Sequence, residues 1–435
     1  YNACRWLIIE RFFALGFLHI DEKNDSRYFD DSCYENDSDD KNDSCYNDDN
    51  NESNESPGGI VAAKNKIKTN PFKPTAGAEP PVLVGRDHVI DDFIDGLDEG
   101  VGAPGRLMRI TGPRGSGKTV LLTELGDVAR KRGWLVVDVT ARTGMLDEII
   151  LALSSKDAIE LSADIDLGIV KAHASTGQKD GARSIRGALT KATSSAVGRA
   201  GVLITVDEVQ DADRDEMVQL ATAVQHLIRE GRDIAFVFAG ITTGVLDFLN
   251  DASLTFLRRA KAEELAPIPL DEVCKAYAKS FAATGMSISG DALKEAAQAT
   301  SGYAFLVQLV GYQVWRKCRR HVDESSIVTI DDVRKGVAEA DREFCDMVIL
   351  PALSGVSRRG IEYLIEMAKV DGAISTATIA RGLGVKPSSL SSTRRTLISK
   401  QVIEPTARGF VTFSIPRMRE YMRENGDELM GWFGA

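Results

Sequence analysis

GPRGSGKT, residues 112–119, is the stretch that decides the fold of this chain. It lies between the apolar runs LMRI and VLLTEL and matches the pattern G-x-x-x-x-G-K-[ST]. In this pattern the glycines let backbone N–H groups point inward around a phosphate, and the N-terminus of the following helix adds a favourable dipole. The stretch therefore predicts a strand, a phosphate-binding loop and a helix, in that order.

Two side chains of this loop have defined tasks in phosphoryl transfer. Lys118 is expected to reach the β- and γ-phosphates, and the Thr119 hydroxyl is expected to ligate Mg²⁺. Because no N-K-x-D sequence follows the loop to indicate guanine, ATP is the expected nucleotide. Further nucleotide contacts are expected from Gly112, Pro113, Arg114, Gly115, Ser116, Gly117 and Val120.

A pair of carboxylates supplies the other half of such a site. The apolar run VLITV ends in Asp207 and Glu208. Asp207 is expected to hold Mg²⁺ through water, and Glu208 is expected to polarise the attacking water. The two motifs together predict an enzyme that hydrolyses ATP.

Four apolar runs predict strands: 106–111, 133–141, 201–208 and 233–240. Each is apolar throughout rather than alternating, which is typical of strands covered on both faces, and helical patterns separate them. The predicted fold class is therefore α/β: a P-loop NTPase with a parallel sheet sandwiched by helices, followed by an α-helical lid and a winged helix-turn-helix domain.

Composition divides the chain into five predicted segments. Residues 1–69 form an acidic, disordered segment, since 27 of the 36 residues from 21 to 56 are Asp, Glu, Asn or Ser and cannot bury enough apolar surface to offset the entropy of ordering. The other segments are the ATPase domain at 70–270, the helical lid at 271–350, the winged helix at 351–424 and a tail at 425–435.

The start of the chain prompts a separate hypothesis. The chain begins with Tyr1 and has no methionine before Met108. We hypothesise that the residues before Val61 are upstream sequence read in frame, with Gly58 and Gly59 encoded by a ribosome-binding sequence and Val61 by a start codon. Glycine codons of another kind at these positions would contradict it.

Charge and cysteine usage indicate the surroundings of the protein. The net charge is −11 and is unevenly distributed: residues 1–60 carry 15 acidic and 5 basic side chains. Residues 352–424 carry 12 Lys or Arg against 6 Asp or Glu, so the C-terminal unit is the candidate for an anionic partner.

The six cysteines form no Cys-x-x-Cys pair, which favours a reducing cytoplasm. The apolar run at 6–20 contains Glu10 and Arg11 and is too short to span a bilayer, so no membrane association is expected.

From Asn70 to about Met422 the sequence resembles the AAA+ ATPases of the origin-recognition-complex type, which are close to the STAND signalling ATPases. The resemblance rests on the C-terminal winged helix and on the motifs VGRD (84–87), GPRGSGKT, VDEVQ (206–210), FVFAG (236–240), TFLRRA (255–260) and SGYAFLVQLVG (301–311). It implies an AAA+ fold in which Val84, Gly85 and Arg86 line the adenine pocket between sheet domain and lid. The lid departs from the pattern because SGYAFLVQ lacks the arginine that many relatives have near this position.

The same resemblance implies two further roles. Thr242 or Thr243, just beyond the fourth strand, would be the polar sensor of the γ-phosphate or the attacking water. Arg258 and Arg259 would supply an arginine finger to a neighbouring subunit, because a guanidinium stays charged and can bridge transition-state oxygens. The alternative for this pair is a solvated helix end without a catalytic task.

The basic C-terminal unit has the helix, helix, helix and hairpin order of a winged helix. Leu390, Leu397 and Ile398 form an inward stripe at helical spacing. Small hydroxyl groups let a helix approach the major groove, and arginines bind phosphates or guanine edges. The residues expected to contact duplex DNA are Ser388, Ser389, Ser392, Arg394 and Arg395, with Arg408 reaching a phosphate or the minor groove from the wing.

Two interpretations of function stay open. In the first, the protein is a DNA-associated ATPase whose hydrolysis drives a conformational switch. In the second, it is a STAND-like regulatory NTPase whose winged helix contacts protein rather than DNA. DNA-stimulated turnover would favour the first, and nucleotide-dependent assembly without DNA would favour the second; a homo-oligomer is compatible with both.

Overall fold

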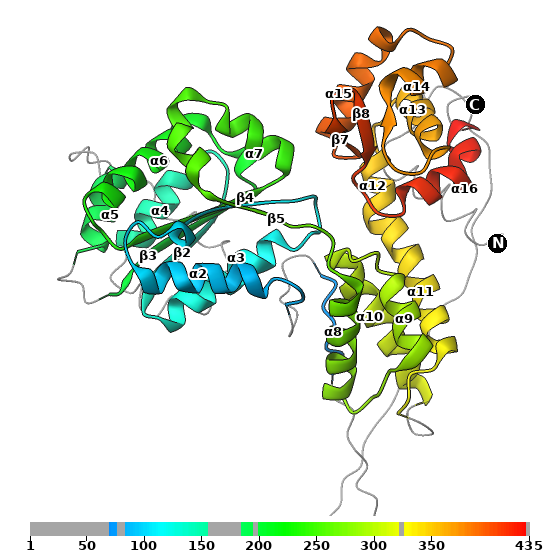
Figure 1. The fold of residues 1–435 in the computed structure, drawn as a ribbon, viewed down its shortest axis with the longest axis horizontal. Helices are drawn as coiled ribbons and strands as arrows, with labels where there is room; N and C mark the ends of the chain where they lie inside the picture. The colour runs from blue at the N-terminus through cyan, green and yellow to red at the C-terminus, as the bar shows by residue number, and fades with distance from the viewer. Residues whose placement is uncertain (1–68, 76–82, 155–183, 195–198, 322–325, 432–435) are drawn as a thin grey trace, which may run out of the picture. The chain divides into compact units, whose positions relative to one another are not determined.

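The computed structural model describes residues 69–75, 83–154, 184–194, 199–321 and 326–431 of the 435-residue chain (Figure 1). The predicted disordered segment up to residue 68, the hypothesised upstream sequence, the apolar run at 6–20 and the first three cysteines lie outside these residues. None of the described helices is long and apolar enough to cross a membrane.

Five parallel strands form the sheet of the first domain, in the spatial order β2-β3-β4-β1-β5. The four predicted strands are present, and a short fifth strand follows them: β1 Leu107–Thr111, β2 Trp134–Thr140, β3 Gly201–Asp207, β4 Ile234–Gly240 and β5 Lys261–Glu264. Thr111 pairs with Gly240, and Thr140 pairs with Asp207. The carboxyl ends of these strands therefore meet at one edge, where open α/β sheets bind ligands.

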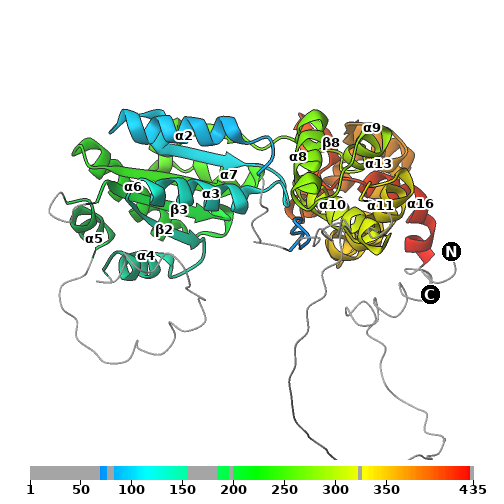
Figure 2. The ribbon, with the colours of Figure 1, turned by 90° about the horizontal axis from the view of Figure 1, so that it is seen from below.

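Helices cover both faces of this sheet (Figure 2). Ile204 and Phe236 pack into a cluster with the helices of one face, whereas Leu203 and Val237 pack into a cluster with those of the other. The helices of the first face are α4 Met145–Ser154, α5 Ile185–Ala192, α6 Arg214–Arg229 and α7 Thr242–Leu249, with the 3₁₀ segments η4 Val209–Asp211 and η5 Ala252–Arg259 beside them; those of the second are α2 Asp87–Glu99 and α3 Lys118–Lys131, with η1 Pro104–Arg106 before β1. Burial on both faces explains why the strand sequences do not alternate.

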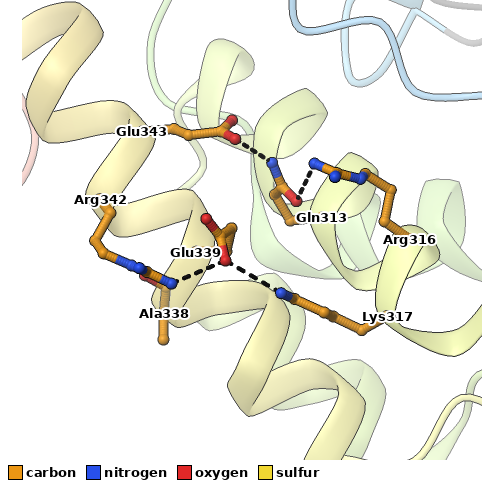
Figure 3. Close-up of polar contacts among 7 residues, drawn as sticks. All are labelled: Gln313, Arg316, Lys317, Ala338, Glu339, Arg342 and Glu343. Carbon is orange, nitrogen blue, oxygen red and sulfur yellow. Dashed lines mark hydrogen bonds and ion pairs between the residues drawn. The ribbon is translucent and has the colours of Figure 1, made fainter. Parts of the chain in front are cut away.

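The predicted lid consists of helices in its described part, with one isolated β-bridge between Ser287 and Ile327. Its helices are α8 Leu270–Ala283, α9 Gly290–Gln298, α10 Ala304–Cys318 and α11 Ile330–Phe344, with η6 Arg319–His321 after α10 and a π-helical turn, Cys345–Ile349, leading into α12 Leu350–Leu353. Polar side chains link α10 to α11 (Figure 3). The fully buried Gln313 donates to Glu343 at 2.6 Å, and Lys317 donates to Glu339 at 3.1 Å, which lowers the pKa of Glu339.

The first described residues pack on the lid rather than on the sheet domain to which the predicted boundary at 70 assigned them. The Phe72 ring lies 5.5 Å from Tyr277 and 5.3 Å from Phe281, and the Asn70 amide donates to the Tyr312 carbonyl at 3.1 Å. Phe72 is only 4% exposed, so the apolar contact explains the placement.

The C-terminal unit has its elements in the expected order. They are α13 Arg358–Ala368, β6 Ile374–Ser375, α14 Thr376–Gly382, η8 Pro387–Leu390, α15 Ser391–Ser399, β7 Ile403–Ala407, β8 Phe410–Phe413 and α16 Met418–Gly431. The strands form an antiparallel sheet in the order β6-β8-β7. Leu390 and Leu397 are buried, as the helical spacing predicted, whereas α16 continues past residue 425, where the tail was expected to begin.

Candidate active site

The predicted phosphate loop lies between β1 and α3, as the motif requires. Gly115 and Gly117 have φ angles of +72° and +93°, in the left-handed region that favours glycine. A Cβ atom at Gly112 would lie 2.8 Å from the Ser116 hydroxyl oxygen, so a side chain there would displace Ser116. Glycine is therefore needed at Gly115 and Gly117 for the backbone conformation and at Gly112 for the close approach of Ser116. This backbone conformation lets a loop of this kind turn its N–H groups toward an anion.

Lys118 is held inside the loop by neutral acceptors. Its ammonium group donates to the carbonyls of Gly112 at 3.1 Å and Pro113 at 2.9 Å, and the side chain is buried. Burial lowers the pKa of Lys118, while the nearby Glu208 and Asp207 raise it. Hydrogen bonds from an ammonium to phosphate oxygens are stronger than those to neutral carbonyls, so an incoming phosphate offers Lys118 better partners.

Thr119 and Asp207 meet although 88 positions separate them in the sequence. The Thr119 hydroxyl donates to Asp207 Oδ2 at 2.5 Å, and the Glu208 backbone N–H donates to Asp207 Oδ1 at 2.8 Å. A hydroxyl and a carboxylate side by side are the hard oxygen ligands that Mg²⁺ prefers, and Mg²⁺ sites of this kind need only one or two protein ligands beside phosphate and water.

Ser116 gives an independent sign that this loop takes a polar ligand. Its hydroxyl oxygen is buried and has no hydrogen-bond partner among the described residues. A buried hydroxyl left unpaired costs about 1–3 kcal/mol, and a phosphate oxygen would pair with it. The residues present therefore fit a nucleotide with Mg²⁺.

Glu208 follows β3 in a strained conformation. Its φ and ψ angles are 52° and 42°, a left-handed geometry that costs a non-glycine residue about 1–3 kcal/mol and that persists mainly at functional sites. One oxygen of its carboxylate, Oε2, accepts a hydrogen bond of 2.5 Å from the Gln210 amide. Sequence reasoning quoted Gln210 within VDEVQ without giving it a role; its polar type on the turn beside Glu208 was the available signal.

The expected sensor and arginine residues lie on the elements that follow β4. Thr242 and Thr243 begin α7 and are half-buried. The Arg258 side chain donates through Nε to the Leu249 carbonyl at 2.7 Å, at the end of α7. Arg259 is exposed and makes no hydrogen bond or ion pair with any described residue. Both side chains are exposed, but only Arg259 makes no such contact with a described residue, so its whole guanidinium is available to another molecule.

The VGRD motif lies beside the segment that joins β5 to α8. The Arg86 guanidinium is buried and donates to the Ala266 carbonyl at 2.8 Å, and this burial lowers the pKa of Arg86. Gly85 has a φ angle of +66°, and a Cβ atom there would lie 3.2 Å from the Ile268 side chain. Val84 packs against the hydrophobic cluster that contains the lid helices. These contacts are at the connection where the adenine pocket was expected.

The N-terminal end of α10 contacts the loop, which sequence reasoning did not foresee. The Tyr303 hydroxyl donates to the Arg114 carbonyl, and the Phe305 N–H donates to the Gly115 carbonyl at 3.2 Å. Burial raises the pKa of Tyr303 to about 12, so the phenol keeps its proton and stays a donor. In SGYAFLVQ, which lacks the arginine of many relatives, a tyrosine thus reaches the loop.

The residues expected to contact DNA differ in exposure. Ser388, Ser389, Ser392, Arg395 and Arg408 are exposed, although the Ser389 hydroxyl also donates to the Lys386 carbonyl at 2.7 Å.

Arg394 does not have the outward orientation that we predicted. Its side chain is half-buried, and its Nε is enclosed without a hydrogen-bond partner in the described part of the chain. It lies near the buried Tyr363 of α13; burial raises the pKa of that phenol, and the positive charge of Arg394 offsets part of the increase. Within α15, Arg394 precedes Leu397 and Ile398 by three and four positions, so helical spacing places it on the same inward face, and the outward assignment was wrong.

Comparisons with known proteins agree with this geometry. Residues 82–237 match the family model described as AAA ATPase domain, and residues 346–422 match one described as Domain of unknown function (DUF8462). None of the curated proteins compared with the chain matches it in sequence.

Two solved structures share the architecture. The Walker-type ATPase PABY2304 of Pyrococcus abyssi is 15% identical with a TM-score of 0.55, over 78% of this chain and 96% of its own. The ORC2 protein of Aeropyrum pernix is 15% identical with a TM-score of 0.52, over 82% of this chain and 97% of its own. Together with the strand order and the loop geometry, these similarities show that the sheet domain has the fold of the AAA+ P-loop NTPases.

Proposed function

We propose that this protein hydrolyses ATP with Mg²⁺ in the AAA+ domain. The observation that carries the proposal is the contact of 2.5 Å between the Thr119 hydroxyl and the Asp207 carboxylate, next to the loop lysine and to the strained Glu208. The carboxyl edge of one sheet thus carries the groups that phosphoryl transfer needs: two oxygen ligands for Mg²⁺, a buried ammonium group and a carboxylate that can act on water.

Each side chain has a defined task in this reaction. Lys118 would exchange its bonds to the carbonyls of Gly112 and Pro113 for bonds to the β- and γ-phosphates. Glu208 would polarise the water that attacks the γ-phosphorus and accept its proton, while the bond from this phosphorus to the β-phosphate oxygen breaks and ADP leaves. Mg²⁺, held by Thr119 and through water by Asp207, would neutralise charge on the phosphate oxygens.

Phosphate release by the full chain tests this proposal directly. We expect turnover of ATP with Mg²⁺ within the usual range for enzymes, of about 1–10³ s⁻¹ or less, and loss of turnover when EDTA removes the metal. GTP is expected to be used less well than ATP, because the guanine motif is missing. Phosphate release that continues at full rate in EDTA would contradict the metal assignment.

We also propose that the C-terminal unit is a winged helix that binds duplex DNA, and that hydrolysis changes its relation to the ATPase domain. Support comes from the excess of 12 basic over 6 acidic residues at 352–424 and from the exposed Arg395 and Arg408. We further propose a homo-oligomer in which Arg259 acts as an arginine finger in the ATP site of the neighbouring subunit; the guanidinium of Arg259, which is unpaired among the described residues, supports this role. A reducing cytoplasm fits the free thiols of Cys274 and Cys318.

One observation favours the STAND-like alternative, in which the same unit contacts protein. Phe410, at the start of β8 beside the wing turn, is 42% exposed. Aromatic side chains are enriched at protein interfaces, whereas DNA interfaces are more polar and more positively charged. DNA-stimulated turnover would support the first reading, and ATP-dependent assembly without DNA would support the second.

Replacement of Arg395 and Arg408 by alanine separates these readings. If each arginine contacts a phosphate, Arg395→Ala and Arg408→Ala should each weaken DNA binding and reduce the slope of log affinity against log salt by about 1. Arg358→Ala is the matched control, because it removes the same charge from an exposed position on α13 where Arg358 pairs with Glu362. Fluorescence anisotropy of a labelled duplex at several KCl concentrations gives both quantities; equal effects of all three variants would contradict a defined DNA face.

A further inference from the structure

Gln210 connects the end of β3 to the segment that leads from β4 into α7. Its side-chain amide donates through Nε2 to Glu208 Oε2 at 2.5 Å and accepts, through Oε1, a hydrogen bond of 3.2 Å from the Ile241 N–H. The first partner is the carboxylate expected to act on water, and the second immediately precedes Thr242, the expected sensor. One neutral side chain therefore joins the carboxylate at the end of β3 to a segment that lies 31 positions beyond Gln210 in the sequence.

Two glycines, Gly240 and Gly244, leave room for the Gln210 side chain. A Cβ atom at Gly240 would lie 2.5 Å from Gln210 Oε1, and a Cβ atom at Gly244 would lie 2.5 Å from Gln210 Cβ. Neither glycine has a positive φ angle, so neither is needed for backbone conformation. Both instead permit close approach, and together they fix the side chain against the N-terminal turn of α7.

The chemistry of the amide suits this place. Glutamine carries a donor and an acceptor at one end of a flexible chain, so it can satisfy a carboxylate and a backbone N–H at the same time. Among the described residues, Gln210 is the only side chain that hydrogen-bonds the Glu208 carboxylate. Its bond engages Oε2 and leaves Oε1 without a hydrogen-bond partner among the described residues.

We propose that Gln210 is a positioning residue, which orients the Glu208 carboxylate for attack on ATP and couples that orientation to the N-terminal turn of α7. The inference rests on the proposed ATP hydrolysis. A shift of the α7 turn, which carries the sensor threonines, would pull on the Ile241–Gln210 bond and reorient Glu208. Hydrolysis would thereby depend on the state of the segment after β4.

Two substitutions at Gln210 distinguish positioning from packing. Gln210→Met keeps the length of the side chain and removes both hydrogen bonds; we expect kcat to fall roughly ten- to a hundredfold with little change in ATP affinity, since a misplaced catalytic group loses rate rather than binding. Asp211→Asn, at an exposed neighbour on the same short helix, is the control and should turn over ATP as the parent does. A kcat for Gln210→Met within twofold of the parent would overturn the proposal.

Gln210→Glu gives a readout that packing alone would not move. The introduced carboxylate can still accept from the Ile241 N–H, but it cannot donate to Glu208. We therefore expect kcat to fall as in Gln210→Met, again with little change in ATP affinity. Turnover at the parent rate in Gln210→Glu would count against the role.

Hydrogen exchange tests the link without any turnover. Gln210→Met removes the acceptor of the Ile241 N–H, so exchange of that amide should speed up at least about tenfold, while the Asp211→Asn control leaves it unchanged. Unchanged exchange in Gln210→Met would refute the link itself. Absence of ATP turnover in the parent, with fast exchange in the variant, would instead refute the proposed hydrolysis and leave the link standing.

Discussion

Lys118→Ala is expected to weaken ATP binding at least about tenfold to a hundredfold, because each charge-assisted hydrogen bond to phosphate contributes about 1.5–3 kcal/mol. The methyl group can make none of these bonds. Lys131→Ala, at the exposed end of the same helix, is the matched control and should bind ATP as the parent does. Isothermal titration calorimetry or the anisotropy of a fluorescent ATP analogue measures the difference.

The stability of Lys118→Ala distinguishes a binding defect from an unfolded protein. Burial lowers the pKa of Lys118, which means that folding disfavours the charged ammonium form. Its removal should therefore leave the melting temperature unchanged or raise it, even as binding is lost. Unchanged ATP affinity in this variant would contradict the assignment of the loop.

Glu208→Gln should separate binding from hydrolysis. The substituted amide keeps a carbonyl oxygen that accepts a hydrogen bond from Gln210, so the geometry of the turn is retained. The amide cannot, however, accept a proton from the attacking water. We expect kcat to fall about 10²- to 10⁴-fold, which is the usual contribution of a general base, with ATP affinity nearly unchanged. Single-turnover phosphate release and equilibrium binding of ATP measure the two effects.

A charge-matched substitution elsewhere in the domain controls for this experiment. Glu230→Gln removes one negative charge at the end of α6, where Glu230 pairs with Arg186, and should leave turnover unchanged. If Glu208→Gln hydrolyses ATP at the parent rate, Glu208 does not activate the water. The left-handed backbone at Glu208 would then need another explanation.

The loop and the strands were predictable because their signals are local. Gly115 and Gly117 have the positive φ angles that only glycine adopts freely, and the motif places them within one turn of a helix. The apolar runs identified four of the five strands, since burial on both faces leaves a mark in the sequence itself. The short, half-exposed β5 carries little of that mark.

Other placements were not predictable, because they depend on partners distant in the sequence. Arg258 and Arg259 are equivalent in the sequence, yet only Arg258 reaches the Leu249 carbonyl. The sequence prediction assigned Arg394 to the surface, but it shares a face of α15 with the buried Leu397, and its Nε lies inside. Tyr303 gives no sequence signal of its contact with the loop, which arises from the fold.

The sequence alone determined that the chain contains a phosphate loop, a strand that ends in two carboxylates, and a basic C-terminal unit, because each depends on residue types at fixed local spacing. Only the tertiary structure decided which groups meet: Thr119 with Asp207, and Gln210 with both Glu208 and the Ile241 N–H. The physical reason is the order of strands in the sheet. The parallel arrangement β3-β4-β1 brings loops from distant parts of the chain to one edge, and no local pattern encodes that order.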